Sequence, residues 1–193
     1  MMDEHLYSSL KWSAILLTLI WVGWTFYDSF FVQITPEDRA YLAGNNFFAD
    51  GHYENALQAY EKALHDNSTH LPALRGKARS LLQLNRYQEA LPIFNQAIQI
   101  EPQFAGTYAN RGILYDRMGW HEEALADYER ALQMNSELGA GPSWLTRFFR
   151  LQPEKPPTIV ERARYLREQL AKPETERLLR LPEVDDKQRP YQK

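Results

Sequence analysis

The side chains best suited to acid–base or metal chemistry are scattered along this chain. The five histidines are His5, His52, His65, His70 and His121. Their spacing does not place two of them as metal ligands on one helix face. The sequence contains no glycine-rich phosphate loop or nucleophile elbow, and the absence of cysteine excludes thiolate nucleophiles and disulfides. We therefore expect a protein that is not an enzyme, with no catalytic residues, no bound metal and no cofactor.

The charged pair with the clearest binding chemistry is Arg75 and Arg79. The two residues are four apart, so they become neighbours on one face of a helix. Two adjacent guanidinium groups can hold a carboxylate through paired, charge-assisted hydrogen bonds. The alternative is that both arginines merely solvate an exposed helix, because charged residues on helices commonly do so.

The composition indicates a folded chain with no general affinity for polyanions. Of the 193 residues, 44% are hydrophobic and 24% are charged, which is ordinary for a globular protein. The net charge is −3, and the basic residues of the tail alternate with acidic ones. We therefore expect no nucleic-acid partner, and the sequence offers no site for a small-molecule substrate.

An apolar segment near the amino end predicts a membrane span. Residues 12–27 read WSAILLTLIWVGWTFY without a charge, and apolar residues continue to Ile34. As a helix, residues 12–34 would extend about 34 Å, enough to cross a hydrocarbon core of about 30 Å. A cleaved signal peptide is disfavoured because bulky residues, not small ones, follow the segment. We predict an amino-terminal tail over 1–11 and one transmembrane helix over 12–34.

The orientation of this span depends on few charges. Lys11 stands before the segment and Arg39 follows it, so counting positive charges barely separates the two sides. The free amino terminus and the position of Lys11 against the span favour a cytoplasmic amino terminus. The remainder of the chain would then lie on the periplasmic or lumenal side.

Five residues of the segment share one helical stripe: Trp21, Trp24, Tyr27, Asp28 and Phe31. One hypothesis is that this stripe packs against another membrane protein, with Asp28 bonded to that partner or to lipid headgroups. The other is that the tryptophans simply dissolve in lipid while Asp28 reaches toward water. Both hypotheses stay open at this point.

Beyond Pro36, one pattern occurs three times at a spacing of 34 residues. The stretches are GHYENALQAYEKAL from 51, NRYQEALPIFNQAI from 85 and GWHEEALADYERAL from 119. Each contains alanine, an aromatic residue four positions later and alanine three beyond it, which places all three on one helix face. Gly51, Asn85 and Gly119 open the stretches with residue types that tolerate the left-handed conformation ending a preceding helix. The pattern predicts paired helices that bury their apolar faces by stacking.

This pattern resembles the tetratricopeptide repeat family, in units 37–70, 71–104 and 105–138. The third unit matches the family pattern at six positions, namely Tyr108, Gly112, Tyr115, Ala124, Tyr128 and Ala131. The resemblance implies an all-α fold: an α-solenoid of three repeats behind the transmembrane helix, with a degenerate capping helix pair. It also implies protein or peptide binding rather than one reaction.

The family's architecture implies that the first helix of each unit lines a concave groove. In this register the partner groove would comprise Tyr41, Asn45, Phe48, Arg75, Arg79, Leu82, Ala109, Ile113 and Asp116. Family members that clamp a chaperone's carboxylate use lysine, asparagine and arginine at set positions, of which only Asn45 is present. Tyr41, Gly76, Gly106 and Asn110 replace the others. The resemblance therefore implies an aromatic-to-basic groove rather than that clamp.

The carboxyl-terminal part is expected to cover the open end of the stack. Residues 139–172 fit a degenerate fourth unit, with one helix starting at Pro142 and a second that turns its apolar residues inward. Those inward residues are Ile159, Ala163, Leu166 and Leu170. The last segment, 173–193, is predicted to be extended. We expect it to be solvated, and the alternative is a docking segment built on LLRLP.

Two functions fit these features. The first is a non-catalytic, membrane-anchored scaffold or assembly factor that binds a peptide or subunit of a membrane protein complex in its groove. The second is a permanent accessory subunit of a photosynthetic, respiratory or secretion complex, held mainly by the transmembrane helix. The partner is a protein in both cases, and one helix supplies the membrane contact.

Overall fold

The helices of this chain are seen in a computed structural model. It describes residues 4–31, 34–141, 157–181, 188, 190 and 191, with side chains from Leu6 to Tyr27 and from Ile34 onward. All regular structure in these ranges is helical, as the sequence predicts. The long helices are α1 (Glu4–Phe31), α2 (Pro36–Ala49), α3 (Tyr53–Asp66), α4 (Leu71–Gln83), α5 (Tyr87–Ile100), α6 (Ala105–Met118), α7 (His121–Met134) and α9 (Ile159–Leu170). Two short 3₁₀ helices are η1 (Ser136–Ala140) and η2 (Glu174–Glu176).

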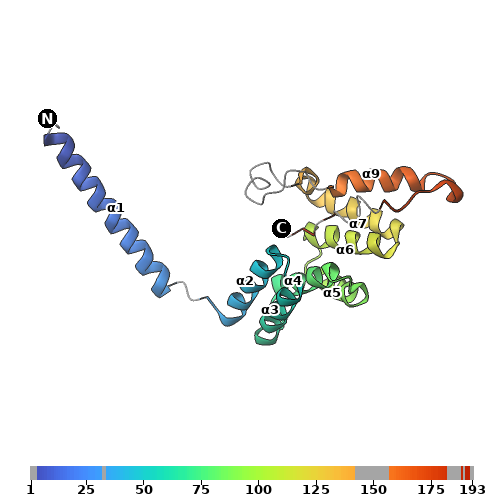
Figure 1. Ribbon diagram of the computed structural model, residues 1–193, viewed down its shortest axis with the longest axis horizontal. Helices are drawn as coiled ribbons and strands as arrows, with labels where there is room; N and C mark the ends of the chain where they lie inside the picture. Colours follow the sequence, from blue (N-terminus) through green and yellow to red (C-terminus); the bar gives the residue numbers. More distant parts are fainter. Residues whose placement is uncertain (1–3, 32–33, 142–156, 182–187, 189, 192–193) are drawn as a thin grey trace.

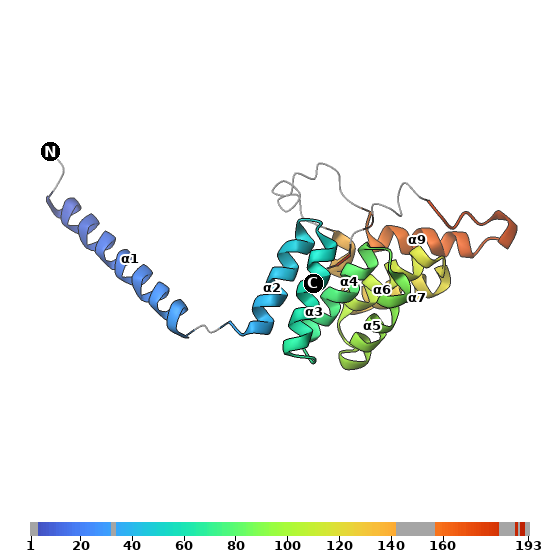
Figure 2. The ribbon, with the colours of Figure 1, turned by 60° about the horizontal axis from the view of Figure 1, so that its bottom comes forward.

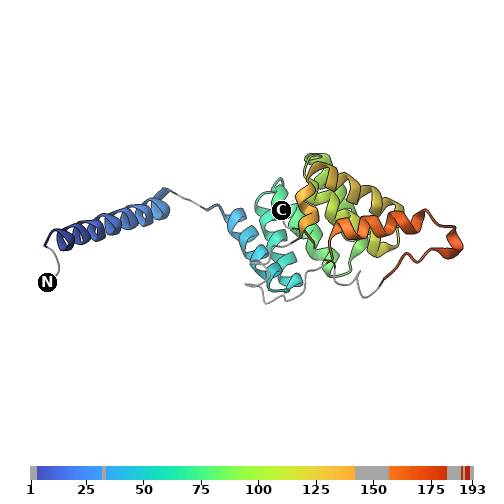
Figure 3. The same ribbon diagram turned by 90° about the horizontal axis from the view of Figure 1, so that it is seen from above.

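Helix α1 stands apart from the remaining helices (Figures 1 and 3). It begins at Glu4 rather than at residue 12, because Leu6 and Leu10 extend the apolar run and Lys11 alone does not interrupt a helix. The stretch long and apolar enough to cross a membrane is Leu6–Tyr27. None of the residues in its most apolar part is buried against the rest of the protein. The next helix starts cleanly because Thr35 caps it and Pro36 occupies its first turn.

The six helices from α2 to α7 form three hairpins that stack side by side (Figure 1). The turns adopt the predicted left-handed conformation, with φ of 81° at Gly51, 59° at Asn85 and 82° at Gly119. After each of these residues, the next N–H donates to a carbonyl in the last turn of the first helix. The three bonds are His52 N to Phe47 O at 2.9 Å, Arg86 N to Leu81 O at 2.9 Å and Trp120 N to Tyr115 O at 2.8 Å. This is the Schellman arrangement, which satisfies orphan carbonyls and reverses the chain.

Each hairpin buries one aromatic side chain completely. Tyr60, Phe94 and Tyr128 have no exposed surface. The ring of Tyr60 lies against Gly44 of its own hairpin and Gly76 of the next, where an added Cβ would come within 2.6 and 2.5 Å of ring carbons. The phenol also donates to Asn45 Oδ1 at 2.8 Å. The two glycines therefore make room for the ring that joins α2 to α4.

Helix α9 packs against α7 at the far end of the stack. Ile159, Ala163 and Leu166 are buried as predicted, and Leu170 is half-buried. Thr158 and Glu161 form a capping box that fixes where the helix starts. The helix predicted to start at Pro142 lies outside the described residues.

Replacing Gly76 tests the aromatic spacer. We expect Gly76→Ala to lower stability by about 1–3 kcal/mol, because its Cβ overlaps the Tyr60 ring in a close-packed site. The midpoint of thermal unfolding, followed by circular dichroism of the full chain in detergent, should fall by several degrees. Gly23→Ala is the control, since nothing lies within 4 Å of its added Cβ. Equal midpoints for both variants would contradict this packing account.

Candidate functional site

The first helices of the three hairpins, α2, α4 and α6, line one face of the stack. We call this face the groove, and its polar members are Asn45, Arg75, Arg79 and Asn110. Figures 1 and 2 show how these helices are arranged in the stack. A segment near the end of the chain returns to them, because both Arg79 and Asn110 bond to Tyr191. We call Gln188, Pro190 and Tyr191 the tail segment.

Several side chains predicted to line the groove are core residues instead. Leu82, Ala109 and Ile113 are at most 1% exposed and belong to the main hydrophobic cluster. Phe48 is 7% exposed and packs edge-on against Tyr53, with ring centroids 5.2 Å apart. These positions face neighbouring helices because each first helix is packed from both sides. They are therefore not available to a partner in this conformation.

Arg75 is neither a free carboxylate receptor nor a solvated surface residue. Its guanidinium is paired with Glu101 and lies over the ring of Phe104, 3.7 Å from the ring centroid. The side chain is only 13% exposed. The predicted pairing of Arg75 with Arg79 on one helix face is present, but Arg75 already has its counter-ion.

Arg79 is a buried cation. It is 4% exposed and lies 5.1 Å from the centroid of Phe48, and burial lowers the pKa of its guanidinium. The group remains charged, because arginine does not lose its proton in proteins. No carboxylate pairs with it among the described residues, and its Nε has no hydrogen-bond partner there. A buried charge without a counter-ion is costly, so this site favours an anion.

The sequence identifies Asn110 only as a replacement of a clamp residue and does not predict its role in the groove. It is 3% exposed, and its amide contacts both backbone groups of one residue. Nδ2 donates to the Tyr191 carbonyl at 2.8 Å, and the Tyr191 N–H donates to Oδ1 at 2.6 Å. Arg79 Nη1 donates to the same carbonyl at 3.3 Å. A side-chain amide used in this way imitates the hydrogen-bonded pair of an antiparallel sheet, so it recognises an extended backbone.

The rest of the tail segment is held on the third hairpin and α9. Gln188 is 2% exposed, and Arg117 Nη2 donates to its carbonyl at 3.2 Å. The Ile159 N–H donates to the Tyr191 hydroxyl at 3.4 Å. The prediction of a solvated tail is therefore wrong for Gln188 and Tyr191. The signals that could have found this docking are an aromatic residue within a polar tail and a polar Asn110 among small residues of α6.

Asp116, predicted to face a partner, instead anchors the cap. It is 4% exposed, and Arg162 of α9 donates to it through Nε at 2.6 Å and Nη2 at 2.8 Å. His121 Nδ1 lies 3.0 Å from the same carboxylate. The Tyr128 hydroxyl donates to it at 3.3 Å, and burial raises the pKa of that phenol, which keeps its proton in place. This carboxylate is fully engaged within the chain.

A cavity of about 330 Å³ remains between the tail segment and the first hairpin. It is lined by Tyr41, Pro72, Arg75, Arg79, Phe104, Asn110 and Tyr191. Its lining thus combines three aromatic rings with two guanidinium groups. We call it the Arg79 pocket.

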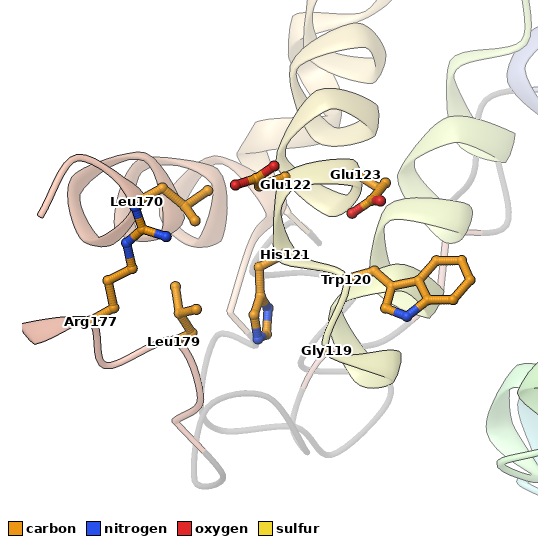
Figure 4. A pocket seen from close by; sticks show the side chains of 8 residues that line it. All are labelled: Gly119, Trp120, His121, Glu122, Glu123, Leu170, Arg177 and Leu179. Atoms are coloured by element: carbon orange, nitrogen blue, oxygen red, sulfur yellow. The ribbon is translucent and has the colours of Figure 1, made fainter. Parts of the chain in front are cut away.

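A second hollow, of about 350 Å³, lies at the start of α7 (Figure 4). Its lining residues are Gly119, Trp120, His121, Glu122, Glu123, Leu170, Arg177 and Leu179. Figure 4 shows the Trp120 ring on the opposite side of the α7 start from Arg177 and Leu179. His121 is engaged with Asp116, so the hollow does not gather a set of reactive groups. Among the described residues, no group of three histidines or carboxylates could hold a metal ion.

The predicted stripe of α1 is exposed where it is described. Trp21, Trp24 and Tyr27 are 67%, 70% and 58% exposed. The side chains of Asp28 and Phe31 lie outside the described residues. Contact of this stripe with a membrane partner stays a prediction.

Comparison with known families matches the stacked hairpins. Two family models, both described as tetratricopeptide repeat, match residues 41–104 and 105–138, which together are about half of the chain. The chain is 36% identical over 48% of its length to a probable UDP-N-acetylglucosamine–peptide N-acetylglucosaminyltransferase SPINDLY of Solanum lycopersicum, and 29% identical over 56% to DnaJ homolog subfamily C member 3 of Gallus gallus. It is 26% identical over 52% to Hsp70-Hsp90 organizing protein 3 of Arabidopsis thaliana. The matches span 9%, 22% and 18% of these relatives' lengths.

Solved structures share the fold at low sequence identity. The first TPR domain of Spaghetti (RPAP3), bound to the HSP90 peptide SRMEEVD, is 20% identical with a TM-score of 0.57, covering 74% of this chain and 99% of that one. The first TPR domain of human RPAP3 is 20% identical with a TM-score of 0.53, covering 68% and 90%. The predicted α-solenoid of repeats is thereby confirmed.

Two arginines of α9 test the anchoring role of Asp116. Arg162→Met leaves the Asp116 carboxylate buried without its main partner, and we expect a loss of about 3–5 kcal/mol in the free energy of unfolding. Arg167→Met removes an exposed pair with Glu129 from the same helix and should cost about 1 kcal/mol or less. Chemical denaturation of both variants measures the difference. Similar losses would show that Asp116 does not anchor the cap.

Proposed function

This chain belongs to the tetratricopeptide repeat family, and from that premise we propose that it is a membrane-anchored interaction module. Its groove binds an extended peptide segment of a membrane protein complex, and the chain acts as a scaffold or assembly factor without catalysing a reaction. The observation that carries this proposal is the Asn110 amide, which pairs with both the N–H and the carbonyl of one residue, Tyr191.

Recognition through the backbone suits a module that must accept an unfolded segment. Main-chain hydrogen bonds supply affinity that does not depend on sequence, and pockets beside them add preference for particular side chains. In this groove Asn110 supplies the backbone contacts and the Arg79 pocket supplies the preference. An acidic side chain entering that pocket would give Arg79 the counter-ion that it lacks, and Tyr41 would pack against the stem of such a side chain.

The proposed ligand differs from the chaperone peptide of the RPAP3 structure. The positions that clamp a carboxylate in such family members carry Tyr41, Gly76 and Gly106 here. Arg79 lies elsewhere on α4. The carboxylate that pairs with Arg79 would therefore belong to an acidic side chain within the bound segment. We therefore propose a subunit or assembly intermediate of a membrane complex as the partner.

The membrane part of the proposal depends on α1. The stretch Leu6–Tyr27 could span a bilayer. Lys11 lies near the amino end of that stretch, where a long side chain can reach the interface, and its position favours a cytoplasmic amino terminus with the groove on the periplasmic or lumenal side. The exposed rings of Trp21 and Trp24 support the second candidate function, a permanent subunit held through its transmembrane helix. The stripe that also holds Tyr27, Asp28 and Phe31 would then be the main contact.

Site-specific photo-crosslinking in native membranes separates these functions. A benzoylphenylalanine replaces Tyr41 in the groove, Trp21 in the span, or Ile100 on the exposed surface of α5 as control. We expect Tyr41 to yield one dominant adduct with a peptide of a membrane-complex subunit, because the groove receives that segment. The crosslinked peptide is identified by mass spectrometry.

The pattern of adducts decides between the two candidates. A partner captured from Trp21 alone would favour the permanent subunit. Adducts from Tyr41 that are no more specific than those from Ile100 would contradict peptide binding in the groove.

A further inference from the structure

The groups that would bind a partner's backbone are already occupied. The nitrogen and the oxygen of the Asn110 amide are both hydrogen-bonded to Tyr191. Arg117 and Arg79 also donate to carbonyls of the tail segment. A second extended backbone cannot use the same amide at the same time. Binding of a partner at this place and docking of the tail segment therefore exclude each other.

The tail segment nonetheless fits the groove incompletely. Gln188 Nε2 is buried without a hydrogen-bond partner among the described residues, and so is Arg79 Nε. The Tyr128 hydroxyl is 3.5 Å from Gln188 Oε1, at the limit of hydrogen bonding. Buried polar groups left unsatisfied weaken a complex. The Arg79 pocket also stays open beside Tyr191, so a better-fitting segment has contacts to gain.

Resting on the proposed function, we propose that the tail segment is a tethered competitor that occupies the groove until a partner segment displaces it. A tether makes such docking effective even when the contacts are weak, because it keeps the segment at a high local concentration. The competing partner segment shares the tail's chemistry: an extended backbone, an aromatic residue in the place of Tyr191 and a side-chain amide three residues before it. It differs by continuing into the Arg79 pocket with an acidic side chain.

The test uses a synthetic, fluorescein-labelled peptide of residues 186–193, DKQRPYQK, titrated with the full-length protein in detergent. The wild-type protein is compared with Tyr191→Ala, whose own tail segment has lost the ring and hydroxyl that hold it. We expect the variant to bind the peptide at least about tenfold more tightly, because the competing tether is weakened. Fluorescence anisotropy measures the dissociation constants.

Two controls keep this result specific to the groove. The peptide DKQRPAQK, without the tyrosine, should not bind either protein. Adding Asn110→Ala to the Tyr191→Ala protein should abolish the gain, while circular dichroism checks that the helices remain. If that double variant unfolds, the peptide DKQRPAQK alone still tests whether binding requires the tyrosine.

Equal affinity of the wild-type and Tyr191→Ala proteins would overturn the proposal, and so would the absence of binding to both. A wild-type dimer held by exchanged tail segments, detected by light scattering and absent from Tyr191→Ala, would overturn the intramolecular form. Crosslinking from position 41 in membranes with Tyr191→Ala separates this inference from the proposed function. A higher yield of adduct in the variant supports both proposals. An unchanged yield overturns only the proposal that the tail segment competes. The absence of an adduct in both proteins overturns the proposed function, and the peptide titration then still tests whether the tail segment docks.

Discussion

The structure depends on one steric constraint: the ring of Tyr60 needs a glycine on each of two neighbouring helices. Gly44 and Gly76 provide those surfaces, and the buried phenol donates to Asn45. Phe94 and Tyr128 stand at the same place in the next two hairpins and are equally buried. Because the Tyr60 ring fixes how closely α2 and α4 approach, it also fixes the face that these two helices present together. The groove is a consequence of this spacing.

At the far end of the stack, the last of the three aromatic rings has different neighbours. Tyr128 packs against Gly112 on its own hairpin, but on the other side it faces polar groups rather than a further glycine. Asp116 accepts from its hydroxyl and from Arg162, and Gln188 lies beside it. The cap and the tail segment thus share one buried polar cluster. Through this cluster, the stability of the last hairpin depends in part on the tail segment that occupies the groove.

The features that repeat were predictable from sequence, and the features that occur once were not. Alanine–aromatic spacing and the turn residues Gly51, Asn85 and Gly119 recur, so local geometry determines their roles. Asp116 looked like a groove residue because its partner Arg162 lies 46 positions away, outside any period. Docking of Tyr191 on Asn110 likewise joins residues 81 positions apart in a tail without periodicity. Such pairings are decided by tertiary packing alone.

The groove is proposed to bind an extended backbone through Asn110, and the Tyr191 amide reports on that binding directly. Hydrogen exchange of ¹⁵N-labelled full-length protein in micelles, followed by NMR, measures that single N–H. We predict exchange slowed by at least about tenfold relative to an unstructured chain, with the protection lost in Asn110→Ala. Exchange of Tyr191 at the rate of an unstructured chain in the wild-type protein would contradict the account.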